Sequence, residues 1–254
     1  MLVARLACRA PRLTLASTLA HRRRFFLSFA QMADAANNLV WIDCEMTGLN
    51  PYLRPNELKE GEEFLPDRIL EIACIVTDKN LEPLDDGVEF IVRTDKEVLD
   101  KMNEWCINQH GKVSAVRACS AQVSRAAHDT LPPQTGLTQA CLDSEYSMEE
   151  VDKLVSDYVS KYFPRGTPAL LAGNSVHADR AFINKDLPLL ASKLHYRILD
   201  VSSIKEIGRR WYPSLGWQSK KDEAEHRALA DIKASIAELT YYREHLFVPP
   251  GQPR

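Results

Sequence analysis

The sequence predicts an α/β protein whose mixed β-sheet carries helices on both faces, for three reasons. Short apolar runs rich in β-branched residues alternate with segments whose apolar residues recur every three or four positions. Three such runs precede the first long helical segment, whereas the later runs alternate with helices, which favours a sheet of mixed direction. The length of 254 residues is enough for one sizeable core, so we expect a single domain.

The expected strands are short and mostly apolar. The second (ILEIACIVT) has the composition of a buried strand, and the third alternates apolar and acidic residues, as a half-buried strand does. In chain order we expect strands at residues 39–43, 69–77, 88–92, 169–172 and 198–201. Functional sites of such sheets gather at the carboxyl ends of strands, and the first strand ends on an acid.

The expected helices carry apolar residues at helical spacing. The clearest stripe has them at positions 148, 151, 154, 155, 158, 159 and 162. In chain order we expect helices at residues 98–109, 148–163, 177–186, 202–211 and 228–245. Residues 51–66 are polar and flanked by prolines, and residues 113–134 lack clear periodicity, so we interpret both as insertions into the domain.

The first 32 residues contain six arginines and no Asp or Glu. An arginine-rich, acid-free start is typical of a mitochondrial presequence, whereas Arg9, Arg12 and His21 interrupt the apolar stretch that a secretory signal needs. We therefore expect a presequence and linker at residues 1–37, one folded domain at 38–247 and a disordered tail at 248–254. A second start at Met32 would give a cytoplasmic form.

The charge of the remaining chain bears on its partners. Without the six arginines it keeps 26 basic and 35 acidic residues, a formal charge of −9. Proteins that grip long nucleic acid through many phosphates usually present a basic surface, so a nucleic-acid substrate should be short or held through metal ions. No run of 18 apolar residues predicts a membrane-spanning helix, and no CxxC pair indicates a zinc or redox site. The cysteines are expected to be reduced thiols, mostly in the core.

Asp43 and Glu45 are expected to lie side by side where the first strand ends. Residues i and i+2 of a strand point to the same face, and two close carboxylates repel unless a cation lies between them. Oxygen ligands of this kind suit Mg²⁺ or Mn²⁺. Taken alone, the pair is better explained as two solvent-facing acids on an edge strand.

Two more acids and a histidine fall at the starts of later helices. Asp179 belongs to the first turn of its helix, Asp231 to the early turns of the last helix, and His226 to the loop before it. Each alone has an ordinary explanation. Together, four carboxylates can hold two Mg²⁺ about 4 Å apart for in-line phosphoryl displacement. A histidine with a pKa near neutrality can take the proton from the attacking water.

Long motifs run through the chain in a fixed order. They are residues 41–49 (WIDCEMTGL), 104–106 (EWC), 110–111 (HG), 173–182 (GNSVHxDxxF), 195–206 (HYRIxDVSSIKE), 209–211 (RRW) and 226–232 (HRALADI). They resemble the oligoribonuclease family, which belongs to the exonucleases named for an Asp-Glu-Asp-Asp site with a histidine. The resemblance covers nearly all of residues 39–247 apart from the two insertions. It implies an RNase H-like exonuclease domain at 38–247 that degrades very short RNA from its 3′ end to nucleoside 5′-monophosphates.

The resemblance also implies a role for each residue of the catalytic centre. Two divalent metal ions, Mg²⁺ or Mn²⁺, would be held by Asp43, Glu45, Asp179 and Asp231, with His226 as the general base. Ala230 departs from the family, which often has a second acid there, but Asp231 keeps the expected spacing from His226.

Substrate contacts are implied in the same way. Leu49 resembles the wedge that packs on terminal bases, and Trp105 and His110 resemble residues of the substrate pocket. Tyr196 matches a tyrosine that a partner subunit lends to the site, which implies a homodimer. The cap for the 5′ phosphate of the substrate is implied at Ser175, Arg197, Ser202 and Lys205. A closed cap limits length, since RNA of about two to five nucleotides would fit and charge-assisted contacts would hold its phosphate.

Two other functions remain open at this point. An exonuclease with the same chemistry that acts on longer strands would share the acids and the histidine, but the residues of the cap argue against an open channel. A catalytically dead RNA-binding protein on the same fold would be expected to lack one or more acids, and all four are present.

Residues 113–134 separate stretches that adjoin in the family pattern. Without them, Lys112 would run directly into Thr135, giving HGKTGLTQA. Val113-Ser114 can be encoded by the usual start of an intron and Gln134 by its usual end. The 22 residues correspond to 66 nucleotides. We favour an intron kept in the coding sequence over a genuine surface loop, although loops tolerate insertions well.

Overall fold

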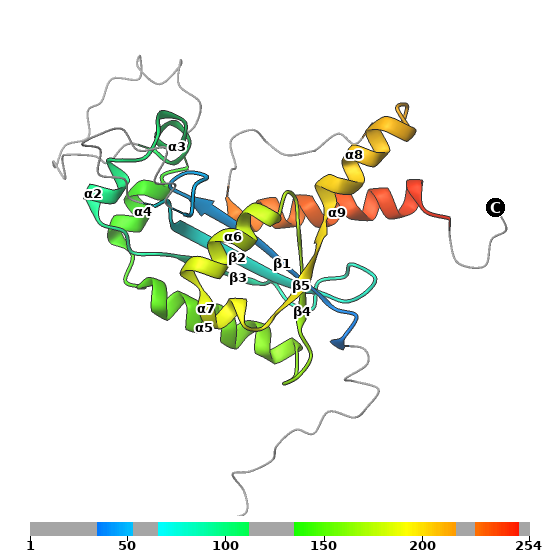
Figure 1. Cartoon of the computed structure of the whole chain (residues 1–254), viewed down its shortest axis with the longest axis horizontal. Helices are drawn as coiled ribbons and strands as arrows, with labels where there is room; N and C mark the ends of the chain where they lie inside the picture. The colour runs from blue at the N-terminus through cyan, green and yellow to red at the C-terminus, as the bar shows by residue number, and fades with distance from the viewer. Residues whose placement is uncertain (1–34, 53–65, 112–134, 217–226, 249–254) are drawn as a thin grey trace, which may run out of the picture.

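The computed structural model describes residues 35–52, 66–111, 135–216 and 227–248. Five strands in this part of the chain form one sheet in the order β3-β2-β1-β4-β5 (Figure 1). The strands are β1 (Leu39–Met46), β2 (Ile69–Thr77), β3 (Val88–Ile91), β4 (Ala169–Gly173) and β5 (Leu194–Asp200). All five strands that the sequence predicts are therefore present.

The strands run in mixed directions, as predicted. β1 pairs antiparallel with β2, and β2 pairs antiparallel with β3. β1 pairs parallel with β4, and β4 pairs parallel with β5. The carboxyl ends of β1, β4 and β5 therefore lie at one edge of the sheet, where ligands commonly bind in α/β folds.

Helices cover both faces of the sheet (Figure 1). They are α2 (Lys96–Leu99), α3 (Glu104–His110), α4 (Leu137–Asp143), α5 (Met148–Tyr162), α6 (His177–Asp186), α7 (Pro188–Ala191), α8 (Val201–Trp211) and α9 (Ala228–Leu246). Along β1, Val40 and Ile42 pack in the core with α5, α6 and α7, whereas Leu39 and Trp41 pack with α8 and α9. Because strand side chains alternate between faces, Asp43 and Glu45 belong to the face that α9 covers.

The single helix expected at residues 98–109 is wrong. The chain instead forms α2, ends it at Leu99 and begins α3 at Glu104. The side chain of Asn103 accepts a hydrogen bond from the backbone N–H of Cys106 at 2.9 Å, which caps α3. An asparagine cap satisfies an otherwise unpaired N–H group and favours a fresh helix start at this position.

The last strand also differs from its expected bounds. It begins at Leu194 instead of residue 198 and ends at Asp200, so that Val201 is the first residue of α8. The carboxylate of Asp200 accepts a hydrogen bond from the N–H of Ser202 at 2.9 Å and caps that helix. The cap explains why the strand stops one residue early.

Two short helices are absent from the sequence prediction. α4 has seven residues and packs Leu137 and Cys141 against Leu70 of β2. α7 has four residues, and its N–H groups at Leu189 and Leu190 donate to Asp152 of α5 at 2.8 and 2.9 Å. Helices this short depend on contacts with other elements, so periodicity does not reveal them.

The segment 112–134 lies outside the described residues, but the residues on either side of it are in contact. The N–H of Thr135 donates to the carbonyl of Gln109 at 3.1 Å. The hydroxyl of Thr138 donates to the carbonyl of Gly111 at 2.6 Å. Gly111 and Gly136 adopt φ angles of 95° and 72°, which glycine tolerates without the clash that a side chain would cause. The chain therefore leaves and re-enters the fold at neighbouring points.

Deleting residues 113–134, so that Lys112 is joined to Thr135, is expected to leave the fold intact. The contacts of Gln109 and Gly111 with the residues beyond the segment do not require it. We expect a midpoint of thermal unfolding within a few degrees of the full chain, because ΔΔG would stay on the order of 1 kcal/mol. A much larger drop would mean that the segment is part of the core. Sequencing cDNA across codons 112 to 135 tests the intron hypothesis directly, since mature transcripts with all 66 nucleotides would refute it.

Two further expectations concern the membrane and the cysteines. Among the described helices, none is both long and apolar enough to cross a bilayer. Cys44, Cys74, Cys106 and Cys141 are buried free thiols, as expected for a reduced core.

Candidate active site

Acidic side chains meet at the edge of the sheet where β1 ends. Asp43 and Glu45 lie on β1, and Asp231 lies in the first turn of α9. One carboxylate oxygen from each of the three lies within 4.8 Å of the other two. Figure 1 shows that α9 begins beside the carboxyl end of β1, which explains how residues so distant in sequence come together.

Asp179 lies nearby but makes a different contact. As predicted, it belongs to the first turn of α6, and its side chain is buried. Its Oδ1 accepts a hydrogen bond at 3.0 Å from the N–H of Cys44, the residue between Asp43 and Glu45. Burial raises the pKa of Asp179 to about 7, against the lowering effect of the hydrogen bond from Cys44. Asp179 thus lies against the same stretch of β1 without belonging to the group of three acids.

The group of three acids fits a hard divalent cation. Mg²⁺ binds oxygen ligands at about 2.0–2.1 Å, so opposite ligands lie about 4.2 Å apart, and Ca²⁺ or Mn²⁺ accept longer distances. Oxygen atoms that all lie within 4.8 Å of one another need only small rotations to share one ion. Without a cation, three carboxylates at this spacing would repel one another.

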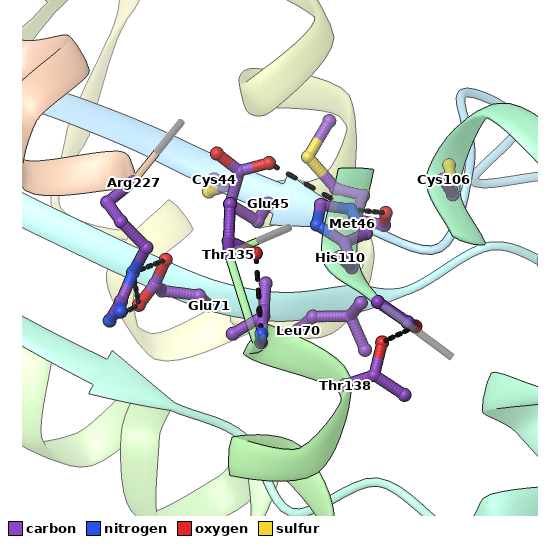
Figure 2. Close-up of polar contacts among 12 residues, drawn as sticks. Cys44, Glu45, Met46, Leu70, Glu71, Cys106, His110, Thr135, Thr138 and Arg227 are labelled. Atoms are coloured by element: carbon purple, nitrogen blue, oxygen red, sulfur yellow. Dashed lines mark hydrogen bonds and ion pairs between the residues drawn. The ribbon is translucent and has the colours of Figure 1, made fainter. Parts of the chain in front are cut away.

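His110 lies beside this group, at the end of α3. It is buried, and its Nε2 lies 3.3 Å from the carbonyl oxygen of Met46 and 4.0 Å from Oε2 of Glu45 (Figure 2). The structure therefore brings the predicted pocket residue His110 against the predicted metal ligand Glu45. His226, the predicted general base, lies outside the described residues and directly precedes Arg227, where the description resumes.

Three predicted substrate contacts are highly exposed. The exposed fractions are 76% for Leu49, 68% for Trp105 and 76% for Tyr196. Leu49 belongs to a turn held by Asp67, which accepts hydrogen bonds from the hydroxyl of Thr47 and the N–H of Asn50 at 2.9 Å each. All three side chains are therefore accessible from solvent.

Three residues of the predicted phosphate cap, Ser175, Ser202 and Lys205, belong to one connected group of polar contacts. The hydroxyls of Ser175 and Ser202 lie 3.1 Å apart, and the N–H of Ser175 donates to Asp200 at 2.9 Å. The Nζ of Lys205 forms an ion pair with the buried carboxylate of Glu238 at 3.2 Å. Asn174 connects these contacts, because its amide accepts from Ser202 and donates to Glu238 at 3.0 Å each.

Arg197, the fourth cap residue, lies on the exposed part of β5. Its guanidinium lies 5.0 Å from the centre of the Tyr196 ring, a cation–π distance, and that ring stacks on His195 at 4.4 Å. The backbone N–H of Arg197 also donates to Nδ1 of His195 at 3.0 Å, so the described contacts of Arg197 are with its sequence neighbours. The described contacts do not join it to the Ser175–Ser202 pair.

Sequence reasoning assigned no role to several polar residues that shape this edge. They are Asp67, Glu71, Asn174, Asp200, Arg227 and Glu238. One of them had a readable signal: Glu71 is an acid within an otherwise apolar strand, and a buried carboxylate requires a partner. Asp200 has one local partner, the N–H of Ser202, but the other contacts described above for these residues are with partners distant in sequence, so only the folded chain identifies them.

Comparisons with known proteins identify the family of this chain. The sequence pattern of a family described as Exonuclease matches residues 40–130 and 122–239. A probable oligoribonuclease of Schizosaccharomyces pombe is 39% identical over 85% of this chain and 71% of that protein. Proteins named mitochondrial oligoribonuclease are 39% identical in Saccharomyces cerevisiae (84% of this chain, 69% of that protein) and 37% identical in Mus musculus (84% and 74%).

Solved structures share the architecture. Exonuclease I from Methylocaldum szegediense superposes with a TM-score of 0.55 at 17% identity, over 82% of this chain and 40% of that chain. Exonuclease I of E. coli in complex with a dT13 oligonucleotide gives 0.53 at 14% identity, over 82% and 41%. These likenesses concern the fold, and with the five-stranded mixed sheet they confirm that it is RNase H-like. Together with the sequence identities above, they lead to one conclusion: this chain is a nuclease and belongs to the oligoribonuclease family of exonucleases.

Proposed function

We propose that the chain degrades short RNA, dinucleotides above all, from the 3′ end to nucleoside 5′-monophosphates by two-metal hydrolysis. The observation that carries the proposal is the group formed by Asp43, Glu45 and Asp231 at the carboxyl end of β1. Relatives of this chain are named oligoribonucleases, which supports RNA of few nucleotides as the substrate class.

The acids of this edge would hold the divalent ions. Asp43, Glu45 and Asp231 are the ligands within reach of one another, and Asp179 is the fourth acid against the same strand. When bound, Mg²⁺ or Mn²⁺ supplies Lewis-acid stabilisation of charge on the phosphoryl oxygens. His226, close in sequence to Asp231, would accept the proton of the attacking water at an imidazole nitrogen.

Substrate length would be limited by the cap. Ser175 and Ser202 present neighbouring hydroxyls, and Lys205 adds a positive charge that is fixed by Glu238. At the other end, Leu49 and Trp105 expose apolar surface suited to stacking with bases. A net acidic domain can bind such a substrate because only one or two phosphates need to be neutralised.

We also propose that the active form is a homodimer. Tyr196 exposes 76% of its surface, although a tyrosine ring is a large apolar group. Lending this ring to the site of a second copy would bury it and would bring Arg197 with it, since the two side chains stack. Sedimentation of the purified chain at micromolar concentration, with Tyr196→Ala as the comparison, tests this assembly.

A series of 5′-labelled RNAs from two to ten nucleotides tests the substrate. With Mg²⁺ or Mn²⁺ present, kcat/KM is expected to be highest for the dinucleotide and to fall with length, because a closed cap collides with longer chains. An efficiency that rises with length would support the alternative exonuclease that acts on longer strands. Binding without any hydrolysis would support the RNA-binding alternative.

The amino-terminal segment is expected to import the chain into mitochondria. Residues 1–34 lie outside the described part of the chain, but relatives from yeast, mouse and cow are named mitochondrial. A fusion of residues 1–32 to a fluorescent protein should enter mitochondria, because six arginines without acids favour import. The same fusion with the arginines changed to glutamine should remain cytosolic. Cytosolic fluorescence from the unmodified fusion would contradict the prediction, and a form that starts at Met32 remains a prediction as well.

A further inference from the structure

An acid–arginine pair next to the three-acid group joins the start of α9 to the middle of the sheet. The Nε of Arg227 donates to both carboxylate oxygens of Glu71 at 3.1 and 3.2 Å, and its Nη2 donates to Oε1 at 2.6 Å (Figure 2). The same Nη2 lies 3.4 Å from Oε2 of Glu89 on β3. One guanidinium therefore connects α9 with two strands.

The acid of this pair lies in the buried interior of a strand. Glu71 is fully buried in β2, where every neighbour along the strand is buried as well. Burial raises the pKa of Glu71, whereas the hydrogen bonds and charge of Arg227 lower it. A buried ion pair is often no more stabilising than an apolar pair of similar volume. The presence of a charged pair here therefore calls for a reason other than the packing of the sheet.

The position of Glu71 relates the pair to the site. Glu71 faces Glu45 directly across the antiparallel β1–β2 ladder, so the two side chains are neighbours on the face that α9 covers. Two bare carboxylates in these positions would repel each other. Because the guanidinium of Arg227 offsets the negative charge of Glu71, Glu45 lies next to an ion pair and not next to a second bare carboxylate.

The backbone of Arg227 relates the pair to Asp231. Its carbonyl accepts the hydrogen bond of the Asp231 N–H at 3.0 Å, so Arg227 opens the helical turn that carries this acid. No side-chain cap is formed at Arg227, the N-cap residue of α9. A rotation of the helix by one residue would turn Asp231 by about 100° and carry it away from β1. The contact with Glu71 thus joins the start of the helix to the sheet through a directional polar contact, beside the apolar packing of Ala228 and Ile232.

We propose that Glu71 and Arg227 are positioning residues that hold the first turn of α9 on β2 and thereby place Asp231 against Asp43 and Glu45 for a divalent cation. The inference rests on the proposed function only in assigning a metal to these acids. A guanidinium that contacts both carboxylate oxygens sets a direction as well as a distance, which a lysine ammonium does not.

The test measures binding of Mn²⁺ alone to the full chain by electron paramagnetic resonance, without RNA. Arg227→Lys keeps the charge but loses the two-point contact, and Glu71→Gln keeps the shape but loses the charge. Each is expected to raise the Kd for Mn²⁺ by about tenfold or more, the usual effect of removing a group that orients a metal ligand. The double variant should be little worse than the worse single one, because both remove the same interaction.

Arg243→Lys is the matched control. Arg243 belongs to the same helix and also ties it to the sheet region, since it donates to the carbonyl of Asn80 at 2.7 Å, but it lies at the other end of α9. Its replacement is expected to leave the Kd for Mn²⁺ within twofold. Thermal unfolding in the absence of metal is measured for every variant.

The outcomes are distinct. A lower unfolding midpoint for Arg227→Lys and Glu71→Gln, with the Kd for Mn²⁺ unchanged, would show a purely structural pair and overturn the proposal. It is also possible to separate the two proposals: the unmodified chain binds Mn²⁺ and Asp43→Ala does not, but RNA is not hydrolysed. The proposed function then fails, and the Kd values of the Arg227 and Glu71 variants alone decide whether the positioning role is correct. If Asp43→Ala leaves Mn²⁺ binding unchanged, the metal site and this inference are both wrong.

Discussion

Replacing Asp231 with alanine is expected to lower kcat for a diribonucleotide by about a thousandfold or more. The change removes one of the three carboxylates that lie within 4.8 Å of one another. Metal stabilisation of charge in the transition state is worth several kcal/mol, and roughly 4 kcal/mol corresponds to a factor of about a thousand. Asp43→Ala is expected to lower kcat to a similar extent. Initial rates in saturating Mg²⁺ and in Mn²⁺ provide the measurement.

A folding defect would give the same loss, so two further measurements accompany the rates. Removing one of three mutually repelling acids should leave the metal-free unfolding midpoint unchanged or raise it. It should also abolish the stabilisation that added Mn²⁺ confers on the unmodified chain. Glu244→Ala, an exposed acid near the other end of α9, is the matched control and should retain full activity. Near-native turnover of Asp231→Ala in Mg²⁺ would remove this acid from the metal site.

Replacing Arg197 with alanine is expected to weaken cleavage of a dinucleotide about ten- to a hundredfold, with much less effect on a longer RNA. A charge-assisted hydrogen bond to a phosphate contributes roughly 1.5–3 kcal/mol, which corresponds to that factor. In the proposed function, a dinucleotide places its 5′ phosphate in the cap while its 3′ end occupies the metal site. The measurement is the ratio of kcat/KM for a dinucleotide and a heptanucleotide.

The stacking of Arg197 on Tyr196 calls for a second variant. Arg197→Ala removes both the charge and the contact with the ring, whose centre lies 5.0 Å from the guanidinium. Arg197→Lys keeps the charge but not the two-point phosphate contact, so it should recover only part of the lost activity. Arg165→Ala changes an exposed arginine just before β4, away from the carboxyl edge, and should leave the ratio unchanged. Equal losses on both RNA lengths would be incompatible with a cap at Arg197.

Local patterns predicted those parts of the fold whose cause is local. β2 was predicted with its observed bounds because its nine consecutive residues are all buried, so that its sequence is apolar except for Glu71 and the final Thr77. α6 was predicted at its observed bounds because Pro188 follows its end. α7 was not predicted, since its first N–H groups are satisfied by Asp152, which belongs to another helix.

The candidate site also has a part that local patterns predict and a part that they do not. That Asp43 and Glu45 share a face follows from the two-residue period of a strand, and the motifs around them sufficed to indicate the family. The sequence by itself thus determined the five strands, the four longest of the described helices, the pair of acids on β1 and the family resemblance. It did so because hydrophobic periodicity, capping and motif order all act over a few neighbouring residues.

Only the tertiary structure decided which distant groups meet. Asp179 contacts the N–H of Cys44 across 135 positions of sequence, and Arg227 contacts Glu71 across 156. It also decided that Asp231, rather than Asp179, joins the pair on β1, and that Lys205 is paired with Glu238. These contacts depend on where α6, α8 and α9 lie on the sheet. That placement is set by the packing of whole helix faces and by buried ion pairs, which no local pattern in the sequence specifies.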